Sequence, residues 1–155
     1  PTKPGWERHC DWCPIDQRNM FFECVGASFR NHSLLGNLIW QCTVNLRWYL
    51  NAVPGSWSLL VQHKSLMRGA VKCLKENASN RKVVQQVTML FEQAIAETHC
   101  GASFRADMRQ LPLDETLRVV RLVNRRDERL VSSTERLARA LQLKISSGET
   151  SAAAS

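Results

Sequence analysis

The sequence lacks the two patterns that most quickly assign a chain to a functional class. No nucleophile, base and orienting group can be paired along its 155 residues, which disfavours an enzyme. It also has no long apolar run free of polar side chains. The most apolar window, residues 34–53, is interrupted by Asn37, Gln41, Asn45, Arg47 and Asn51. A bilayer core tolerates such residues poorly, so this window predicts a buried helix and no transmembrane span.

A second Cys-x-x-Cys motif is also missing. Cys10 and Cys13 form one such motif, with Cys24 and either His9 or His32 available to complete a ligand set. A two-residue gap lets both thiolates reach one tetrahedral zinc ion. Because one motif supplies only half of a usual zinc site, we predict that this segment binds no metal. The alternatives for its cysteines are free thiols or a local disulfide.

The six cysteines have no regular spacing, so they do not resemble a disulfide scaffold. Cys42 and Cys73 fall on predicted apolar helix faces, where a free thiol behaves as a small hydrophobic group. We therefore expect a reducing compartment for the helical part of the chain.

The charge balance is basic. There are 21 Lys and Arg residues against 14 Asp and Glu residues, a formal net charge of +7. Such a surplus suits nucleic acid, an anionic membrane surface or an acidic protein partner, and it does not choose among them. It is equally ordinary for proteins of a basic compartment such as the mitochondrial matrix.

Hydrophobic periodicity predicts an all-α fold. Apolar residues recur at spacings of three and four over residues 33–53, 56–76 and 81–98, with Ser33 as N-cap and Pro54 ending the first segment. Links this short predict an antiparallel three-helix bundle. Its predicted core is Leu35, Leu38, Ile39, Leu46, Leu50, Leu66, Met67, Leu74, Val84, Val87, Phe91 and Ile95.

Segments on either side extend this predicted bundle of residues 33–98. Residues 1–32 have no sustained period and predict an irregular segment rich in cysteine and aromatics, with a short helix over 16–25 as an option. Residues 99–145 predict an arginine-rich helical extension, with Asp114 as a cap and a capping box from Ser132 to Glu135. Residues 146–155 predict a flexible tail. The pentapeptide Gly-Ala-Ser-Phe-Arg occurs at 26–30 and 101–105, but its flanks differ, so we interpret it as coincidence.

Two groups of cations are candidate binding surfaces. Lys64, Arg68, Lys72 and Lys75 stand at i, i+4, i+8 and i+11, so they stack along one outer helix face. Like charges at this spacing weaken an isolated helix, so the row indicates either a solvated face or an anionic partner. The arginines of the extension are interleaved with acids and do not alternate with aromatics. They predict a solvated or subunit-facing helix, and no nucleic-acid partner.

Residues 38–98 resemble the LYR-motif family of small mitochondrial three-helix proteins. The motif position reads Asn45-Leu46-Arg47, with leucine in place of the family's tyrosine and asparagine in place of its leucine. The second helix closes on residues 71–78, with Leu74 where the family usually has phenylalanine. Within the family, the Val53-Pro54 break and residues 81–84 look most like accessory subunits of mitochondrial NADH:ubiquinone oxidoreductase (complex I).

This resemblance implies a non-catalytic accessory subunit of a respiratory complex, on the matrix side of the inner mitochondrial membrane. Its partners would be the other subunits and an acyl carrier protein, whose acidic helix docks on a basic face. That face would comprise Arg47, Lys64, Arg68, Lys72 and Lys75. No cofactor would be bound directly, but the partner's acyl-phosphopantetheine would enter beside Leu46, Tyr49 and Leu74.

Two alternatives stay open. Residues 108–116, followed by Arg118 to Leu122, are similar to the Leu-Pro-led helix of a small matrix-side subunit of the cytochrome bc1 complex. A small basic RNA-binding protein, mitoribosomal or viral, is the other. Steep loss of RNA affinity with rising salt would identify that class, because phosphate contacts release counterions.

Overall fold

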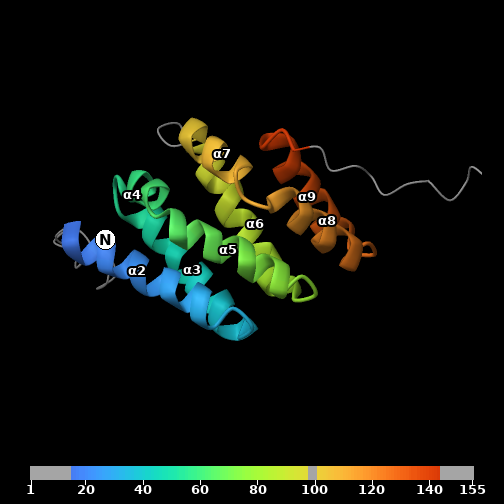
Figure 1. Ribbon diagram of the computed structural model, residues 1–155, viewed down its shortest axis with the longest axis horizontal. Coiled ribbons are helices and arrows are strands. Elements are labelled where there is room, and N and C mark those ends of the chain that lie inside the picture. Colours follow the sequence, from blue (N-terminus) through green and yellow to red (C-terminus); the bar gives the residue numbers. More distant parts are fainter. Residues whose placement is uncertain (1–14, 98–100, 144–155) are drawn as a thin grey trace, which may run out of the picture.

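The computed structural model describes residues 15–97 and 101–143, which form eight helices and no strand (Figure 1). The all-α prediction is therefore confirmed for this part of the chain. The helices are α2 (Ile15–Asn31), α3 (Gly36–Ala52), α4 (Ser56–Gln62), α5 (Lys64–Glu76), α6 (Arg81–Ala96), α7 (Gly101–Arg109), α8 (Leu113–Val123) and α9 (Glu128–Ala140). None of these described helices is long and apolar enough to span a membrane.

The helices form three stacked hairpins, α2–α3, α5–α6 and α8–α9. In one layer α2 packs on α5 and α5 on α8, and in the other layer α3 packs on α6 and α6 on α9 (Figure 1). The short helices α4 and α7 connect one hairpin to the next. This is the arrangement of helix pairs in α-solenoids, in which each pair is stabilised by contact with its neighbours.

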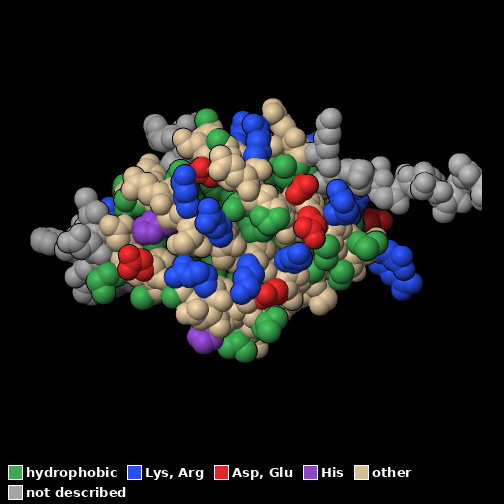
Figure 2. All heavy atoms as spheres, in the orientation of Figure 1, with side chains coloured by type: hydrophobic (Ala, Val, Ile, Leu, Met, Phe, Trp, Pro, Cys, Tyr) green, Lys and Arg blue, Asp and Glu red, His purple; other side chains and the backbone are tan. Residues whose placement is uncertain are grey.

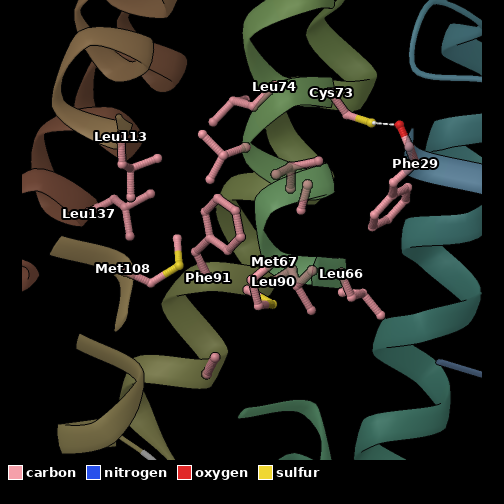
Figure 3. Close-up of a cluster of buried hydrophobic side chains, with 14 of the residues drawn as sticks. Phe29, Leu66, Met67, Cys73, Leu74, Leu90, Phe91, Met108, Leu113 and Leu137 are labelled. Carbon is pink, nitrogen blue, oxygen red and sulfur yellow. Dashed lines mark hydrogen bonds between the residues drawn. The ribbon is translucent and has the colours of Figure 1, made fainter. Parts of the chain in front are cut away.

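The middle hairpin, α5–α6, supplies the centre of the core. Figure 3 shows Leu74 and Phe91 from this hairpin between Phe29 of α2 on one side and Leu113 and Leu137 of the third hairpin on the other. All five side chains are buried. Because α5 and α6 are covered on both sides, the hairpins form one continuous core rather than separate units.

Two glycines lie where α2 packs on α5. A Cβ atom placed on Gly69 would lie 3.0 Å from the Cβ of Phe29, and one on Gly26 would lie 3.5 Å from the Cα of Leu66. A side chain at Gly69 would therefore crowd Phe29, whereas the distance at Gly26 is an ordinary van der Waals contact. The missing side chain of Gly69 allows the close packing of the first and second hairpins.

The three hairpin turns, residues 32–35, 77–80 and 124–127, have the same length and the same backbone bonds. In each, the N–H of the fourth residue donates to the carbonyl of the first, at 2.8–3.0 Å. The last residue of the second and third turns caps the following helix. Asn80 accepts from the N–H of Val83 and Asp127 from that of Leu130, both at 3.3 Å.

Asparagines tie each turn to the one before it. The Nδ2 of Asn77 donates to the carbonyls of Cys73, at 2.9 Å, and Ser33, at 2.6 Å. The Nδ2 of Asn124 repeats this one hairpin later, bonding Val120 at 2.8 Å and Ala78 at 2.6 Å. We call these two residues and their bonds the asparagine ladder.

The three-helix bundle predicted over residues 33–98 is not confirmed, because α2 and α8 also pack on α5 and α9 packs on α6. The prediction of irregular structure over residues 1–32 is wrong for residues 15–31, which form α2. The optional short helix over 16–25 lies within α2, which is longer than predicted. The helix predicted over residues 56–76 is broken at His63, whose backbone leaves the helical region with φ −90° and ψ 69°. The Nε2 of His63 lies 3.1 Å from Oδ1 of Asn19, so a side chain of α2 contacts the residue at which the helix breaks.

Ten of the twelve predicted core residues are buried, and Leu35 and Leu38 are exposed. Leu35 is exposed because α3 begins at Gly36, later than predicted, which leaves Leu35 at the N-cap position. Leu38 lies inside α3 but outside its buried face, which carries Ile39, Thr43, Leu46 and Leu50. Ser33 does not cap the helix. Its carbonyl instead accepts the bond from Asn77.

The caps predicted for the extension were also wrong. Asp114 lies in the first turn of α8, whose N-cap residue is Pro112. The capping box predicted from Ser132 lies within α9, which begins four residues earlier behind the N-cap Asp127. Both helices begin earlier than their predicted caps, and the cap of α9 is another local residue, Asp127, which accepts from the N–H of Leu130.

Cys73 provides a chemical test of the α2–α5 contact. Its buried Sγ lies 3.3 Å from the carbonyl of Phe29 (Figure 3). Burial, reinforced by the negative charge of Glu76, raises the pKa of the Cys73 thiol to about 12. Since the thiolate is the reactive form, we expect Cys73 to resist iodoacetamide at pH values near 8 while exposed Cys24 is alkylated. Peptide mass spectrometry over time would measure this, with denatured protein as the control. Equal rates for the two thiols in folded protein would contradict the packing described.

Candidate docking groove

A groove runs between α5 on one side and α7 with the start of α8 on the other, and it encloses about 530 Å³. Its lining is largely apolar along the floor and basic along the α5 rim. The apolar residues include Val61, Met67, Val71, Phe104, Met108 and Leu111. The basic residues are Lys64, Arg68, Lys72 and Lys75, which we call the cation row. The structure thus brings together all four cations predicted from their spacing on the helix.

Helix α5 presents this row because its opposite face is needed for the core. The face that packs into the molecule carries Leu66, Ala70, Cys73 and Leu74, all buried. Since the cations repeat every three or four residues, they fall on the remaining face, where they stay exposed. Figure 2 shows Lys and Arg side chains gathered over α5 with hydrophobic surface among them.

Ion pairs bridge the groove at two places. The Nζ of Lys64 lies 3.6 Å from Asp107 of α7, and the Nζ of Lys75 lies 3.3 Å from Glu115 of α8. Both pairs are exposed to solvent, so each contributes only about 0.2–1 kcal/mol. Lys64 and Lys75 can therefore leave these carboxylates and bind the anion of a partner at little cost in free energy.

The cations between these bridges are less neutralised. Lys72 lies 3.9 Å from Glu76 of its own helix and 3.5 Å from the carbonyl of Arg30. Arg68 makes no ion pair with another described residue. The middle of the groove therefore combines an apolar floor with a guanidinium and an ammonium that are available to an anion.

Arg47 does not belong to this site. It lies on α3, where its Nε donates to Gln93 at 3.0 Å and its Nη1 to Gln86 at 2.5 Å, both on α6. Partial burial lowers the pKa of Arg47, and the two amide oxygens meet its donors instead of an anion. The structure thus places Arg47 in the α3–α6 layer, apart from the cation row on α5.

The predicted acyl-lining residues also lie elsewhere. Leu46 and Leu74 are fully buried, and Tyr49 packs on the rings of Phe21 and Phe22, with centroids 4.5 and 5.7 Å away. None of the three lines the groove.

The sequence analysis did not predict the second wall of the groove, which is formed by α7. Phe104 and Met108 line the apolar floor and Asp107 pairs with the cation row. Their spacing of three and four residues marks an amphipathic helix, but no local pattern indicates that this helix faces α5.

The candidate metal ligands are not brought together in the described part of the chain. Cys24 is exposed on α2, whereas His9, Cys10 and Cys13 lie outside the described residues. Among the described residues, no group of three or more His, Cys, Asp or Glu side chains is placed to hold a metal ion.

Comparisons of the chain with protein-family models, curated proteins and solved structures found no match.

Proposed function

We propose that this chain is a non-catalytic docking subunit whose groove receives an acidic amphipathic helix of a partner protein. The observation that carries the proposal is the middle of the groove, where Arg68 and Lys72 stand above an apolar floor. A charged helix face that only meets solvent would not account for the apolar groove beside the cation row. A partner helix with carboxylates along one edge and apolar anchors on its face satisfies both features.

Charge and apolar contact would have separate roles in this docking. The cation row steers an anionic partner and sets its orientation, because exposed charges act mainly on association rate and specificity. The apolar side chains of the partner, seated on half-buried Val61 and Leu111 beside Met67, would supply most of the affinity. Arg68 is the strongest single anchor, since a planar guanidinium binds carboxylate or phosphate oxygens in pairs.

The specific form of the proposal names the partner as an acyl carrier protein within a mitochondrial respiratory complex, complex I by the resemblance of residues 38–98. The groove differs from the site that the resemblance implies, because it excludes Arg47, Leu46 and Leu74. We propose that the acyl chain lies on the groove floor and that the phosphopantetheine phosphate meets Arg68. The acidic carrier helix would run along the cation row.

The test is binding of an acylated carrier protein to a double reversal, Arg68→Glu with Lys72→Glu. Each reversal replaces attraction by repulsion at about 1 kcal/mol, so we expect about a 30-fold loss of affinity. Binding of the parent chain should weaken as salt rises. Surface plasmon resonance or calorimetry would measure both effects.

Two control variants sharpen this test. Arg125→Glu with Arg126→Glu makes the same charge change on exposed residues outside the groove and should bind as the parent does. Arg47→Ala should also bind normally, which separates the groove from the site implied by the resemblance. Undiminished binding by the Arg68 and Lys72 reversal would refute the groove, and no binding by the parent chain would refute the carrier protein as partner.

A further inference from the structure

The three hairpin turns lie along one edge of the molecule, at the lower right of Figure 1. The asparagine ladder holds them in line, since Asn77 bonds the first turn and Asn124 bonds the second. We call this surface, formed by the three turns and the helix ends beside them, the turn edge. Its composition differs from that of the groove.

Exposed aliphatic side chains concentrate on the turn edge. Seven large hydrophobic residues are exposed in the described part of the chain, and five of them lie in a hairpin turn or within three residues of one. These are Leu34, Leu35, Leu38, Leu122 and Val123, with 75, 55, 37, 66 and 50% of their surface exposed. They form two groups, one at the first turn and one at the third, and the middle turn between them carries none. Single exposed leucines are ordinary, but two such groups on one edge indicate an interaction surface.

Unpaired arginines accompany these side chains. Arg125, Arg126 and Arg129 line a shallow hollow next to Val123 and make no ion pair with another described residue. Arg81 lines the same hollow but is paired with Asp127 at 3.1 Å. Asp127 also caps α9, so among the described residues that line the hollow Glu128 is the remaining acid beside the three guanidinium groups.

We propose that the turn edge docks on the surface of an anionic lipid bilayer. Aliphatic side chains at the tips of turns can enter the interfacial region, and arginines beside them meet the lipid phosphates. RNA is the less suitable partner, because proteins bind unpaired bases by stacking them on aromatic rings and the exposed residues here are aliphatic. This inference does not depend on the proposed function, since the turn edge and the cation row use different residues.

The test is sedimentation of the full chain with phosphatidylcholine vesicles, prepared with and without phosphatidylglycerol. We expect binding to the anionic vesicles at physiological ionic strength and little binding to the neutral ones. Each arginine near such a surface contributes about fivefold to partitioning. The triple variant Arg125→Gln, Arg126→Gln, Arg129→Gln should therefore partition about a hundredfold more weakly.

Matched variants distinguish the contribution of the turn edge to vesicle binding from the effect of net charge and from nonspecific hydrophobic adsorption. Lys64→Gln, Arg68→Gln, Lys72→Gln removes the same charge from the groove and should bind vesicles nearly as the parent does. Leu34→Ser with Val123→Ser should weaken partitioning about tenfold. Met20→Ser, which alters an exposed side chain on α2 outside the turns, should not. Circular dichroism melting would confirm that each variant is folded.

Several results would overturn the inference. One is failure of the parent chain to sediment with anionic vesicles, and another is equal loss of binding in the two triple variants. A third is binding of an RNA oligonucleotide that depends on Arg125, Arg126 and Arg129 without any binding to vesicles. Because carrier-protein binding is measured separately, failure here leaves the groove proposal standing, and the converse also holds.

Discussion

Replacing Leu66 with aspartate is expected to unfold the protein at neutral pH. Leu66 is almost fully buried on α5, and its Cα lies 3.5 Å from the position that a Cβ on Gly26 of α2 would take. A carboxylate there would be removed from water. The guanidinium of Arg30 lies nearby, since its Nη1 would be 3.1 Å from a Cβ on Gly26, but burying a charge costs several kcal/mol even where a partner can approach. We expect a loss of about 3–5 kcal/mol, comparable with the whole stability of a marginally stable domain.

The pH dependence of this variant follows from the same burial. A buried carboxyl has a raised pKa, so its neutral form is tolerated better than its charged form. The variant should therefore recover part of its stability as the pH falls. Ser65→Asp is the matched control, because Ser65 is exposed in the first turn of α5, where a negative charge favours the helix. Thermal and urea melts followed by circular dichroism would measure both. A Leu66→Asp melting temperature equal to that of the control would show that the α2–α5 contact is misplaced.

The presence of most helices could be predicted because the pattern that indicates a helix lies within the helix itself. The apolar stripe of α6, from Val83 to Ile95, recurs every three or four residues and needs no information from elsewhere. The cation row was predictable for the same reason, since i, i+4 spacing alone places Lys64, Arg68 and Lys72 on one face. Local patterns therefore account for most helices and for one wall of the groove.

The neighbours of each helix were not predictable in this way. The close α2–α5 contact depends on Gly69, which is unremarkable in the sequence and matters only because Phe29 of the other helix lies against it. The hydrogen bonds of Arg47 were not predictable for a similar reason. Its partners Gln86 and Gln93 lie about forty residues away in the sequence and on another helix. A charge on a helix face indicates a partner, but only packing shows whether the partner is inside the chain.

The structural repeat is also hidden in the sequence. The three turns share a backbone pattern, yet their first residues are His32, Asn77 and Asn124, and only two of these can form the ladder. The pentapeptide that does recur lies in α2 and in α7, which have different places in the stack. Similarity of turns is set by backbone hydrogen bonds, which many sequences satisfy, so a repeat of structure needs no repeat of residues.

Replacing Asn77 with alanine is expected to destabilise the protein by about 1–3 kcal/mol, because it removes two buried hydrogen bonds and leaves the carbonyl of Ser33 without this donor, whereas the carbonyl of Cys73 keeps the backbone N–H of residue 77. Asn51→Ala, at an exposed position on α3, is the matched control and should change stability by less than about 0.5 kcal/mol.

Asn77→Asp should destabilise the protein more than Asn77→Ala, since a carboxylate oxygen would face both carbonyl oxygens. Asn124→Ala should cost less than Asn77→Ala, because Asn124 is only half-buried and joins the last hairpin instead of the middle one. Urea melts of the four variants would measure this order. If Asn77→Ala matched Asn51→Ala, the stacking of the hairpins would owe its stability to the apolar core alone.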